Sequence, residues 1–339
     1  MVAITAVVPT LNRPELLREA LRSLQQQTLP PDEIIVVDDG STPAVDQTAL
    51  RAEFGHQLRV LRNEKSRGLA YGRNWGVEEA QGKYVVHLDD DDLLAPSTLE
   101  EAYDLLLSDP ALEIVFLGVA GFGARSDHFN RVQPEAVGRA CARANGTQFE
   151  GGLVSFDERL MCAMLKAVPA SFQHPMLSRD TWSKVSALRW RAYTVDTAAA
   201  SVEDAKGLIT GQLRDSEWAI YAAAICAKTA LLNVPRYLAR CEGQSLSSKP
   251  ANVEKHLLQN LGIKKQLFRA ASMPELARWR EQIRDSLADT HSDAAYHYFQ
   301  KGQRTVAWRH ACAALGTRPS LAGVRLALRV WLPRSAQPQ

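Results

Sequence analysis

The stretch K-Y-V-V-H-L-D-D-D-D-L-L-A-P, Lys83 to Pro96, determines the fold that we predict for this chain. Its first part, Tyr84 to Leu88, is apolar and rich in β-branched and aromatic residues, which is typical of a short buried strand. Four carboxylates, Asp89 to Asp92, follow at once. Because alternate side chains of an extended chain point to one face, we expect Asp89 and Asp91 to point together where the strand stops.

The four carboxylates allow two interpretations. Adjacent carboxylates repel one another unless a cation lies among them. Paired hard oxygens suit Mg²⁺ or Mn²⁺, which proteins usually hold through one or two carboxylates together with substrate phosphates. Ligands of open α/β sheets bind beyond the carboxyl ends of the strands, which is where these acids lie. The alternative is a solvated acidic turn before a helix that starts near Pro96, with an aspartate at the helix cap.

Strand and helix patterns alternate on the N-terminal side of this stretch. Ala3 to Val8, Glu33 to Val37 and Leu58 to Leu61 are apolar runs of strand length. After the first run we expect a helix with Asn12 as its cap and Pro14 in its first turn. This order predicts βαβ units, and therefore an α/β fold whose mainly parallel sheet is covered by helices on both faces. Neither a G-x-G-x-x-G fingerprint nor a Walker A lysine loop follows the first run, so a Gly-rich phosphate loop is not expected.

Polar residues end three of the predicted strands. They are Thr10 and Asn12, Asp38 and Asp39, and Asp89 and Asp91. Because the carboxyl ends of parallel strands meet at one edge of a sheet, we expect these side chains to converge on one crevice. The sequence therefore predicts a nucleotide-type fold that holds a diphosphate with the help of a metal ion.

The composition limits the classes of partner and compartment. The 339 residues carry 40 basic and 38 acidic side chains, so the net charge of +2 gives no reason to expect nucleic acid binding. The segment from Lys301 to Gln339 is different, with seven Lys or Arg and no Asp or Glu. Five scattered cysteines without a C-x-x-C pair favour reduced thiols, and no apolar run is long enough for a transmembrane helix. We expect a soluble, cytoplasmic protein.

Four motifs together resemble the inverting GT-A glycosyltransferases of family 2. They are V-V-P-T-L-N-R-P (7–14), I-V-V-D-D-G-S (35–41), R-G-L-A-Y-G-R-N-W-G (67–76) and G-K-Y-V-V-H-L-D-D-D-D-L-L-A-P (82–96). The resemblance covers about residues 3 to 248 and is absent beyond about Pro250. It implies a GT-A glycosyltransferase domain over residues 1–248, which is Rossmann-like. From about Ala251 the sequence pattern turns helical, so we expect a helical C-terminal region over residues 249–339.

The resemblance implies a UDP- or dTDP-linked sugar donor. The matching positions are Pro9, Thr10, Asn12, Arg13, Asp38, Asp39, Gly68, Arg73, Asp89, Asp90 and Asp91. Thr10 and Asn12 would line the nucleobase and ribose pocket, and one of Asp38 or Asp39 would hydrogen-bond the base. An ordinary Asp-Gly turn is the alternative for that pair. Arg73 would lie near the phosphates or brace the acidic cluster, unless it is a surface cation of a helix.

The resemblance also implies a metal site and a catalytic base. Asp89 and Asp91 match the D-x-D motif for Mn²⁺ or Mg²⁺, with Asp91 as the direct ligand, and Glu242 stands where many members have a histidine that can reach the ion. An exposed surface role is the alternative for Glu242. Asp215 best matches the base, with Glu217 second, although Arg214 replaces the first acid of the usual pair. Asp215 could instead only cap its helix.

The second half of the chain holds two further features that bear on function. Ala294 to Pro319 is similar to one tetratricopeptide-like helix pair, which would have to pack on neighbouring helices. Leu321 to Leu332 is amphipathic with two arginines, and it could make peripheral contact with an anionic membrane or simply pack in a core. The acceptor implied by the family is a glycan or lipid-linked saccharide of surface polysaccharide assembly. The alternatives are a catalytically inactive GT-A scaffold or glycan-binding protein, and a nucleotidyltransferase, which would need the missing Gly-rich loop.

Overall fold

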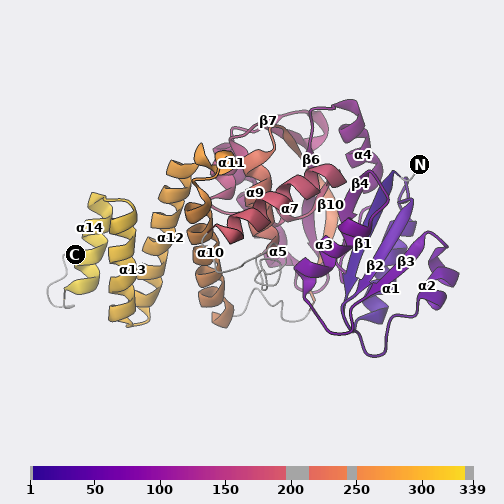
Figure 1. Cartoon of the computed structure of the whole chain (residues 1–339), viewed down its shortest axis with the longest axis horizontal. Coiled ribbons are helices and arrows are strands. Elements are labelled where there is room, and N and C mark those ends of the chain that lie inside the picture. Colours follow the sequence, from indigo (N-terminus) through magenta and orange to yellow (C-terminus); the bar gives the residue numbers. More distant parts are fainter. Residues whose placement is uncertain (1–2, 196–213, 243–249, 333–339) are drawn as a thin grey trace. The chain divides into compact units, whose positions relative to one another are not determined.

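The computed structural model describes residues 3–195, 214–242 and 250–332. The chain divides into two compact units (Figure 1). Unit 1 comprises Met1–Trp190 and Val202–Ser245, and unit 2 comprises Arg191–Ser201 and Leu246–Gln339. No helix among the described residues is both long and apolar enough to cross a bilayer.

Unit 1 is an α/β unit with one ten-stranded sheet. Its strands are β1 (Ile4–Thr10), β2 (Glu33–Asp38), β3 (Leu58–Arg62), β4 (Tyr84–His87), β5 (Leu93–Leu94), β6 (Ile114–Phe122), β7 (Thr147–Gln148), β8 (Leu153–Phe156), β9 (Pro175–Ser178) and β10 (Thr229–Arg240). Its helices are α1 (Pro14–Gln25), α2 (Gln47–Phe54), α3 (Leu69–Glu79), α4 (Thr98–Ser108), α5 (Ser126–Arg143), α6 (Leu160–Met164), α7 (Arg179–Thr194) and α9 (Arg214–Ile225), with short 3₁₀ turns at Glu150–Gly152 and Ala170–Gln173.

The strand order places the predicted βαβ units at one side of the sheet. The order is β3-β2-β1-β4-β9-β6-β10-β8-β7, with β5 paired to β10. Strands β3, β2, β1 and β4 are all parallel, and β6 is parallel to β10. The short β9 runs antiparallel between β4 and β6. The sheet is therefore mixed but mainly parallel, as expected, and the carboxyl ends of β1, β2 and β4 meet at one edge.

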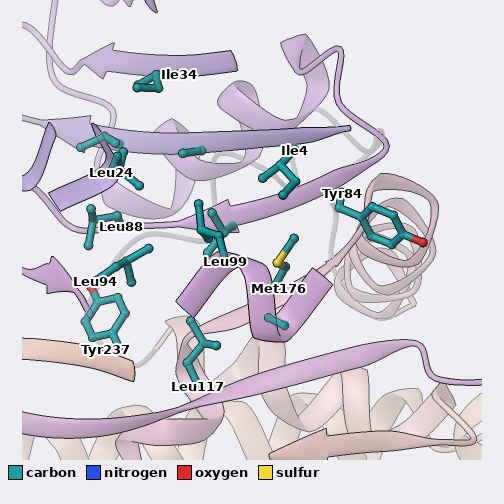
Figure 2. Close-up of a cluster of buried hydrophobic side chains, with 14 of the residues drawn as sticks. Ile4, Leu24, Ile34, Tyr84, Leu88, Leu94, Leu99, Leu117, Met176 and Tyr237 are labelled. Atoms are coloured by element: carbon teal, nitrogen blue, oxygen red, sulfur yellow. The ribbon is translucent and has the colours of Figure 1, made fainter. Parts of the chain in front are cut away.

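Both faces of the parallel part are buried, which explains why its strands are uniformly apolar. On one face, Ile4 and Val8 of β1 join the core formed with α1 and α4. Figure 2 shows part of this core, to which Leu24 of α1, Leu99 of α4, Ile4 and Tyr84 all contribute. On the other face, α3 packs against β1 and β2.

Glycine allows α3 to approach the sheet closely. A Cβ atom added at Gly76 would lie 2.3 Å from Cγ1 of Val7. A Cβ atom at Gly72 would lie 3.4 Å from Cβ of Pro9. Because α3 carries Arg73 between these glycines, the close approach fixes where that arginine enters the site.

Helix α1 begins as expected at Pro14, but the cap prediction was wrong. Arg13 occupies the cap position and makes no side-chain cap hydrogen bond. Asn12 has a positive φ of 57°, and its Oδ1 accepts a hydrogen bond from the N–H of Thr42 at 2.7 Å. The amide of Asn12 thus joins the loop that precedes α1 to the loop that follows β2.

Unit 2 is helical, which confirms the predicted C-terminal helical extension. Its helices are α10 (Pro250–Ala270), α11 (Pro274–Ala277), α12 (Arg280–Gln300), α13 (Arg304–Thr317) and α14 (Leu321–Trp331). Ala295, Ala311 and Ala327, one from each of the last three helices, form a small buried cluster. Small side chains at the contact let the helices pack closely.

Candidate active site

A cavity of about 360 Å³ opens at the carboxyl edge of β1, β2 and β4. It is lined by Pro9, Thr10, Leu11, Arg13, Asp39, Ser66, Gly68, Leu69, Asp89, Asp90 and Asp91. Each of the three strand ends therefore contributes at least one predicted polar residue to this cavity: Thr10 after β1, Asp39 after β2, and Asp89 and Asp91 after β4. Asn12 and Asp38 are predicted site residues that do not line this cavity. Asn12 instead lines a neighbouring cavity of about 280 Å³, to which Thr10 and Arg13 also contribute.

The four aspartates form a turn rather than an extended continuation of β4. Strand β4 ends at His87, and the N–H of Asp92 donates to the carbonyl oxygen of Asp89 at 3.1 Å. The expectation that alternate extended residues point to one face was therefore wrong. Even so, Asp89 and Asp91 both line the cavity, because the turn wraps along its wall.

Each carboxylate of this turn has a different partner. Asp90 accepts a hydrogen bond from Oγ1 of Thr10 at 2.7 Å and is paired with Arg13 at 3.1 Å. Arg13 also pairs with Asp91 at 2.7 Å, and both of these side chains are more than a third exposed. Burial raises the pKa of Asp90, and the contacts with Thr10 and Arg13 oppose that rise. The cation that the acidic cluster requires is thus provided in part by Arg13.

Asp92 is the carboxylate that does not line the cavity. It accepts hydrogen bonds from the hydroxyl of Tyr237 at 2.9 Å and from the N–H of Arg240 at 2.7 Å. Burial, together with the charge of Asp89, raises the pKa of Asp92 to about 7. The cap of α4 is Ser97, so Asp92 ties the acidic turn to β10 instead of starting a helix.

Arg73 joins the acidic turn to the second half of unit 1. Its side chain is 5% exposed, and its guanidinium pairs with Asp89 at 2.5 Å and with Oδ1 of Asp215 at the start of α9. Burial opposes the charge of Arg73, but the two carboxylates raise its pKa above the ordinary value. Burial alone would raise the pKa of Asp89, but the charge of Arg73 reverses this effect and lowers it. The burial of Arg73 excludes the alternative of a surface cation, and its two ion pairs favour bracing of the acidic cluster.

The two candidate bases on α9 lie in different environments. The Asp215 side chain is 30% exposed beside Arg73. Glu217 is fully buried and accepts two hydrogen bonds from the buried Arg189, at 2.6 and 3.1 Å. A carboxylate enclosed in this way cannot reach an acceptor hydroxyl, so Asp215 remains as our candidate base.

Asp38 and Asp39 both hold backbone, but only Asp39 reaches the cavity. Asp38 is fully buried, pairs with Arg62 and accepts from the N–H groups of Ser41 and Val45. Burial alone would raise the pKa of Asp38, but the hydroxyl and N–H of Ser41, the N–H of Val45 and the charge of Arg62 together lower it. Asp38 therefore takes the turn-forming role that we gave as the alternative.

Asp39 positions the loop that precedes α3. Its two oxygens accept hydrogen bonds from the side chains of Asn63 and Ser66 and from the N–H groups of Arg67 and Gly68, all between 2.6 and 2.9 Å. Gly68 has a φ of 91°, and a Cβ atom there would meet nothing within 4 Å. The glycine is thus required for backbone conformation and leaves one wall of the cavity open.

Glu242 does not line the cavity. Its carboxylate lies 3.6 Å from a guanidinium nitrogen of Arg240, and its side chain is 54% exposed. Among residues 3–195, 214–242 and 250–332, no three His, Cys, Asp or Glu side chains are grouped so that they could enclose a metal ion. Asp89 and Asp91 still offer hard oxygen donors on one wall of the cavity, which fits Mg²⁺ or Mn²⁺ only if a substrate supplies further oxygens.

The sequence reasoning missed a buried layer behind the turn. The hydroxyl of Tyr237 accepts from the N–H of Asp89 at 3.2 Å, and its ring stacks on His174 with centroids 3.7 Å apart. Burial lowers the pKa of His174 to about 4 and that of His87 to about 3. Both histidines are therefore neutral at physiological pH. No spacing in the sequence could have placed Tyr237 next to Asp89, because strand pairing brings them together.

Residues 5–168 match the model of a family described as glycosyl transferase family 2. The uncharacterized glycosyltransferase YwdF of Bacillus subtilis is 40% identical over 98 residues, which are 29% of this chain and 36% of the relative. An uncharacterized glycosyltransferase of Haemophilus influenzae is 30% identical over 113 residues, 33% of this chain and 37% of the relative. The matches thus span little more than a third of either relative's length.

A solved structure has a similar fold. The structure of residues 1–349 of TarS from S. aureus, in complex with UDP-GlcNAc, is similar with a TM-score of 0.53 and 17% identity. The similarity covers 97% of this chain and 79% of that chain. This likeness and the family match confirm the predicted GT-A class, an α/β unit followed by helices.

Proposed function

We propose that this chain, whose residues 5–168 match the model of glycosyl transferase family 2, transfers a sugar from a nucleoside diphosphate sugar to a hydroxyl group. The donor would be UDP- or dTDP-linked. The acceptor would be a glycan or lipid-linked saccharide of surface polysaccharide biosynthesis, and the transfer would invert the anomeric centre. We place the reaction on the cytoplasmic side of the membrane, which agrees with five cysteines that are all free thiols.

One observation carries the proposal. Arg73 lies between Asp89, which lines the cavity, and Asp215, the candidate base. An inverting transfer requires a group that stabilises the leaving diphosphate and a carboxylate that accepts the proton of the acceptor, within reach of the same sugar carbon. The shared arginine supports this arrangement, because it holds the two carboxylates to one point.

The residues of the cavity suggest how the donor binds. Thr10 and Asp39 lie on the wall formed by β1 and β2, where we propose that the nucleoside is held. Asp39 already accepts four hydrogen bonds. The nucleobase of the donor would therefore compete with the loop from Ser66 to Gly68 for the carboxylate oxygens of Asp39. Asn12 would contact the nucleoside from the neighbouring cavity, and Pro9 would form part of the wall of the larger cavity.

The transfer step uses Asp215. Its carboxylate would accept the proton of the acceptor hydroxyl while the hydroxyl oxygen bonds to the anomeric carbon. At the same time the bond from that carbon to the diphosphate oxygen breaks, and its electron pair leaves with the nucleoside diphosphate. The attack from the opposite side inverts the anomeric centre. Arg73 holds Oδ1 of Asp215, which orients Oδ2 as the proton acceptor.

Asp89 and Asp91 would hold a Mg²⁺ or Mn²⁺ ion together with the diphosphate. Such an ion supplies charge neutralisation for the leaving diphosphate. Asp91 is the more exposed of the two, and Arg13 beside it would have to share that carboxylate with the ion. We therefore keep Asp91 as the direct ligand and assign Asp90 to the hydrogen bond with Thr10.

The test is donor hydrolysis across a panel of nucleotide sugars that includes UDP-GlcNAc, with Mn²⁺, Mg²⁺ or EDTA. We expect slow hydrolysis of one donor, and its loss in EDTA and in Asp91→Ala. Asp215→Asn should lower transfer to an acceptor by about 10²–10⁴-fold, the usual contribution of a general base, without loss of donor binding. Asp104→Asn, at an exposed aspartate of α4, is the control and should change neither.

The inactive scaffold is the outcome that would replace this proposal. It predicts that a nucleoside diphosphate and Mn²⁺ raise the melting temperature while no donor is hydrolysed and no acceptor is glycosylated. Equal turnover by wild type and Asp215→Asn would instead remove Asp215 as the base and leave the donor site intact.

A further inference from the structure

Helix α14 presents its larger apolar side chains to solvent. A surface helix normally buries such residues and exposes polar ones. Here the small residues Gly323 and Ala327 are buried together with Val330, while four large apolar residues are exposed. These four form the apolar stripe: Leu321 (80% exposed), Val324 (44%), Leu328 (49%) and Trp331 (65%). The alternative that this stripe packs in a core is therefore wrong for the part of the chain that the structure describes.

The apolar stripe is continuous along the helix. At about 100° per residue, its four members fall within an arc of about 80° on the helix surface. Arg325 and Arg329 follow next to this arc, on one side, and both are exposed. The exposed half of α14 thus consists of an apolar strip beside a basic one.

The helix that carries the stripe is fixed at both ends. Ser320 caps α14 by accepting a hydrogen bond from the N–H of Gly323 at 3.0 Å. At the other end, Arg304 of α13 donates to the carbonyl oxygens of Val330, at 2.6 Å, and Leu332. Ala327 packs in the alanine cluster with α12 and α13. The stripe is therefore a defined surface of a packed helix rather than a frayed end.

The charge around the stripe indicates what covers it. The segment from Lys301 to Gln339 has seven Lys or Arg and no Asp or Glu. A second copy that packed its α14 antiparallel on this one through a symmetric contact would bring the same positive strip against this one, which is unfavourable. A surface that is apolar inside and negatively charged outside matches both strips, and an anionic lipid bilayer has that structure.

We propose that α14 docks unit 2 on an anionic membrane surface. The apolar stripe enters the boundary between headgroups and acyl chains, with Trp331 at the interface where tryptophan is favoured. Arg325 and Arg329 lie beside it at the level of the lipid phosphates. This inference does not rest on the proposed sugar transfer, because it concerns lipid binding alone.

The test is sedimentation of the full-length chain with vesicles of phosphatidylcholine alone or mixed with phosphatidylglycerol. We expect binding to the anionic vesicles, weakened by salt. Leu328→Ser with Trp331→Ser should lower the partition coefficient at least about tenfold, and Arg325→Gln or Arg329→Gln about fivefold each. Trp308→Ser, at a partly exposed tryptophan of α13, is the matched control and should bind like wild type.

A second readout locates the contact on the helix. Brominated acyl chains quench a tryptophan that enters the bilayer, so quenching of wild type should exceed that of Trp331→Phe. Three results would each overturn the proposal. They are no binding to anionic vesicles, equal binding by wild type and the double variant, and equal quenching with and without Trp331. A dimer in light scattering that the double variant makes monomeric, without vesicle binding, would assign the stripe to a second copy.

Discussion

Replacing Arg73 by methionine tests the link between the acidic turn and the candidate base most directly. Methionine fills much of the same space without charge. Arg73 is buried, and its guanidinium is the shared partner of Asp89 and Asp215. The change therefore removes one cation and leaves two partly buried carboxylates facing each other.

The expected loss of stability follows from that geometry. Removing one partner of a buried ion pair costs about 3–5 kcal/mol. Here the carboxylate side chains are 24% and 30% exposed, so water offsets part of the loss and we expect about 2–3 kcal/mol. For a unit of this size that corresponds to a fall in Tm of about 5–10 °C. Arg22→Met is the control, because Arg22 and its partner Glu53 are 52% and 37% exposed and such a pair contributes less than about 1 kcal/mol.

The loss of stability in Arg73→Met should depend on pH. Arg73 lowers the pKa of Asp89 below its ordinary value of 3.8. A carboxylate with a lowered pKa in the folded state contributes stability above its unfolded pKa and loses it as the pH falls through the folded pKa. The difference in Tm between wild type and Arg73→Met should therefore be largest near pH 7 and narrow below about pH 4.

Thermal unfolding followed by circular dichroism at pH 7 and pH 3.5 measures both effects. If the difference in Tm between wild type and Arg73→Met were the same at the two pH values, the charge pairing would not account for the loss of stability. A fall in Tm at pH 7 no larger than that of Arg22→Met would refute the buried bridge itself.

Two further predictions concern residues around the site. Because the pKa of Asp92 is raised from 3.8 to about 7, the folded state keeps a proton that the unfolded state releases, and wild-type stability falls as the pH rises from about 4 to 7. Asp92→Asn removes this dependence, so its Tm relative to wild type should rise between pH 5 and pH 8; a constant difference would contradict the assignment. Gly76→Ala should cost about 1–3 kcal/mol in urea unfolding, because its Cβ would overlap Val7. Gly138→Ala, in a helix where the Cβ meets nothing within 4 Å, should instead be neutral or stabilise by up to about 1 kcal/mol, and equal losses in both would argue against the tight packing of α3.

The parallel half of the sheet could be predicted from the sequence because its signals are local. Strands buried on both faces are continuous apolar runs, and each of β1, β2 and β4 shows one. Polar residues at the strand ends then located the cavity, since topology alone brings those ends to one edge. Thr10, Asp39, Asp89 and Asp91 were found in this way and do line the cavity.

The other half of the sheet could not be predicted, because its pairings connect distant segments. Strand β9 inserts antiparallel between β4 and β6, and its residue Met176 pairs with Val86. No periodicity in either segment encodes that register. Pairings between distant segments also explain why His174, just before β9, and Tyr237, on β10, were missed as neighbours of the acidic turn.

The choice between the two candidate bases shows most clearly what the sequence alone cannot predict. Asp215 and Glu217 are both acidic and both lie in the first turn of α9. Residues two apart on a helix point in directions about 200° apart, so one of them must face away from any site that the other faces. Which one faces the site depends on the position of two arginines, Arg73 and Arg189, that are far from both in sequence. Arg189 takes Glu217 into the core, and Arg73 holds Asp215 at the partly exposed edge beside Asp89. The sequence could therefore define the pair, and only the tertiary structure could place Asp215 beside Arg73 and Glu217 in the core.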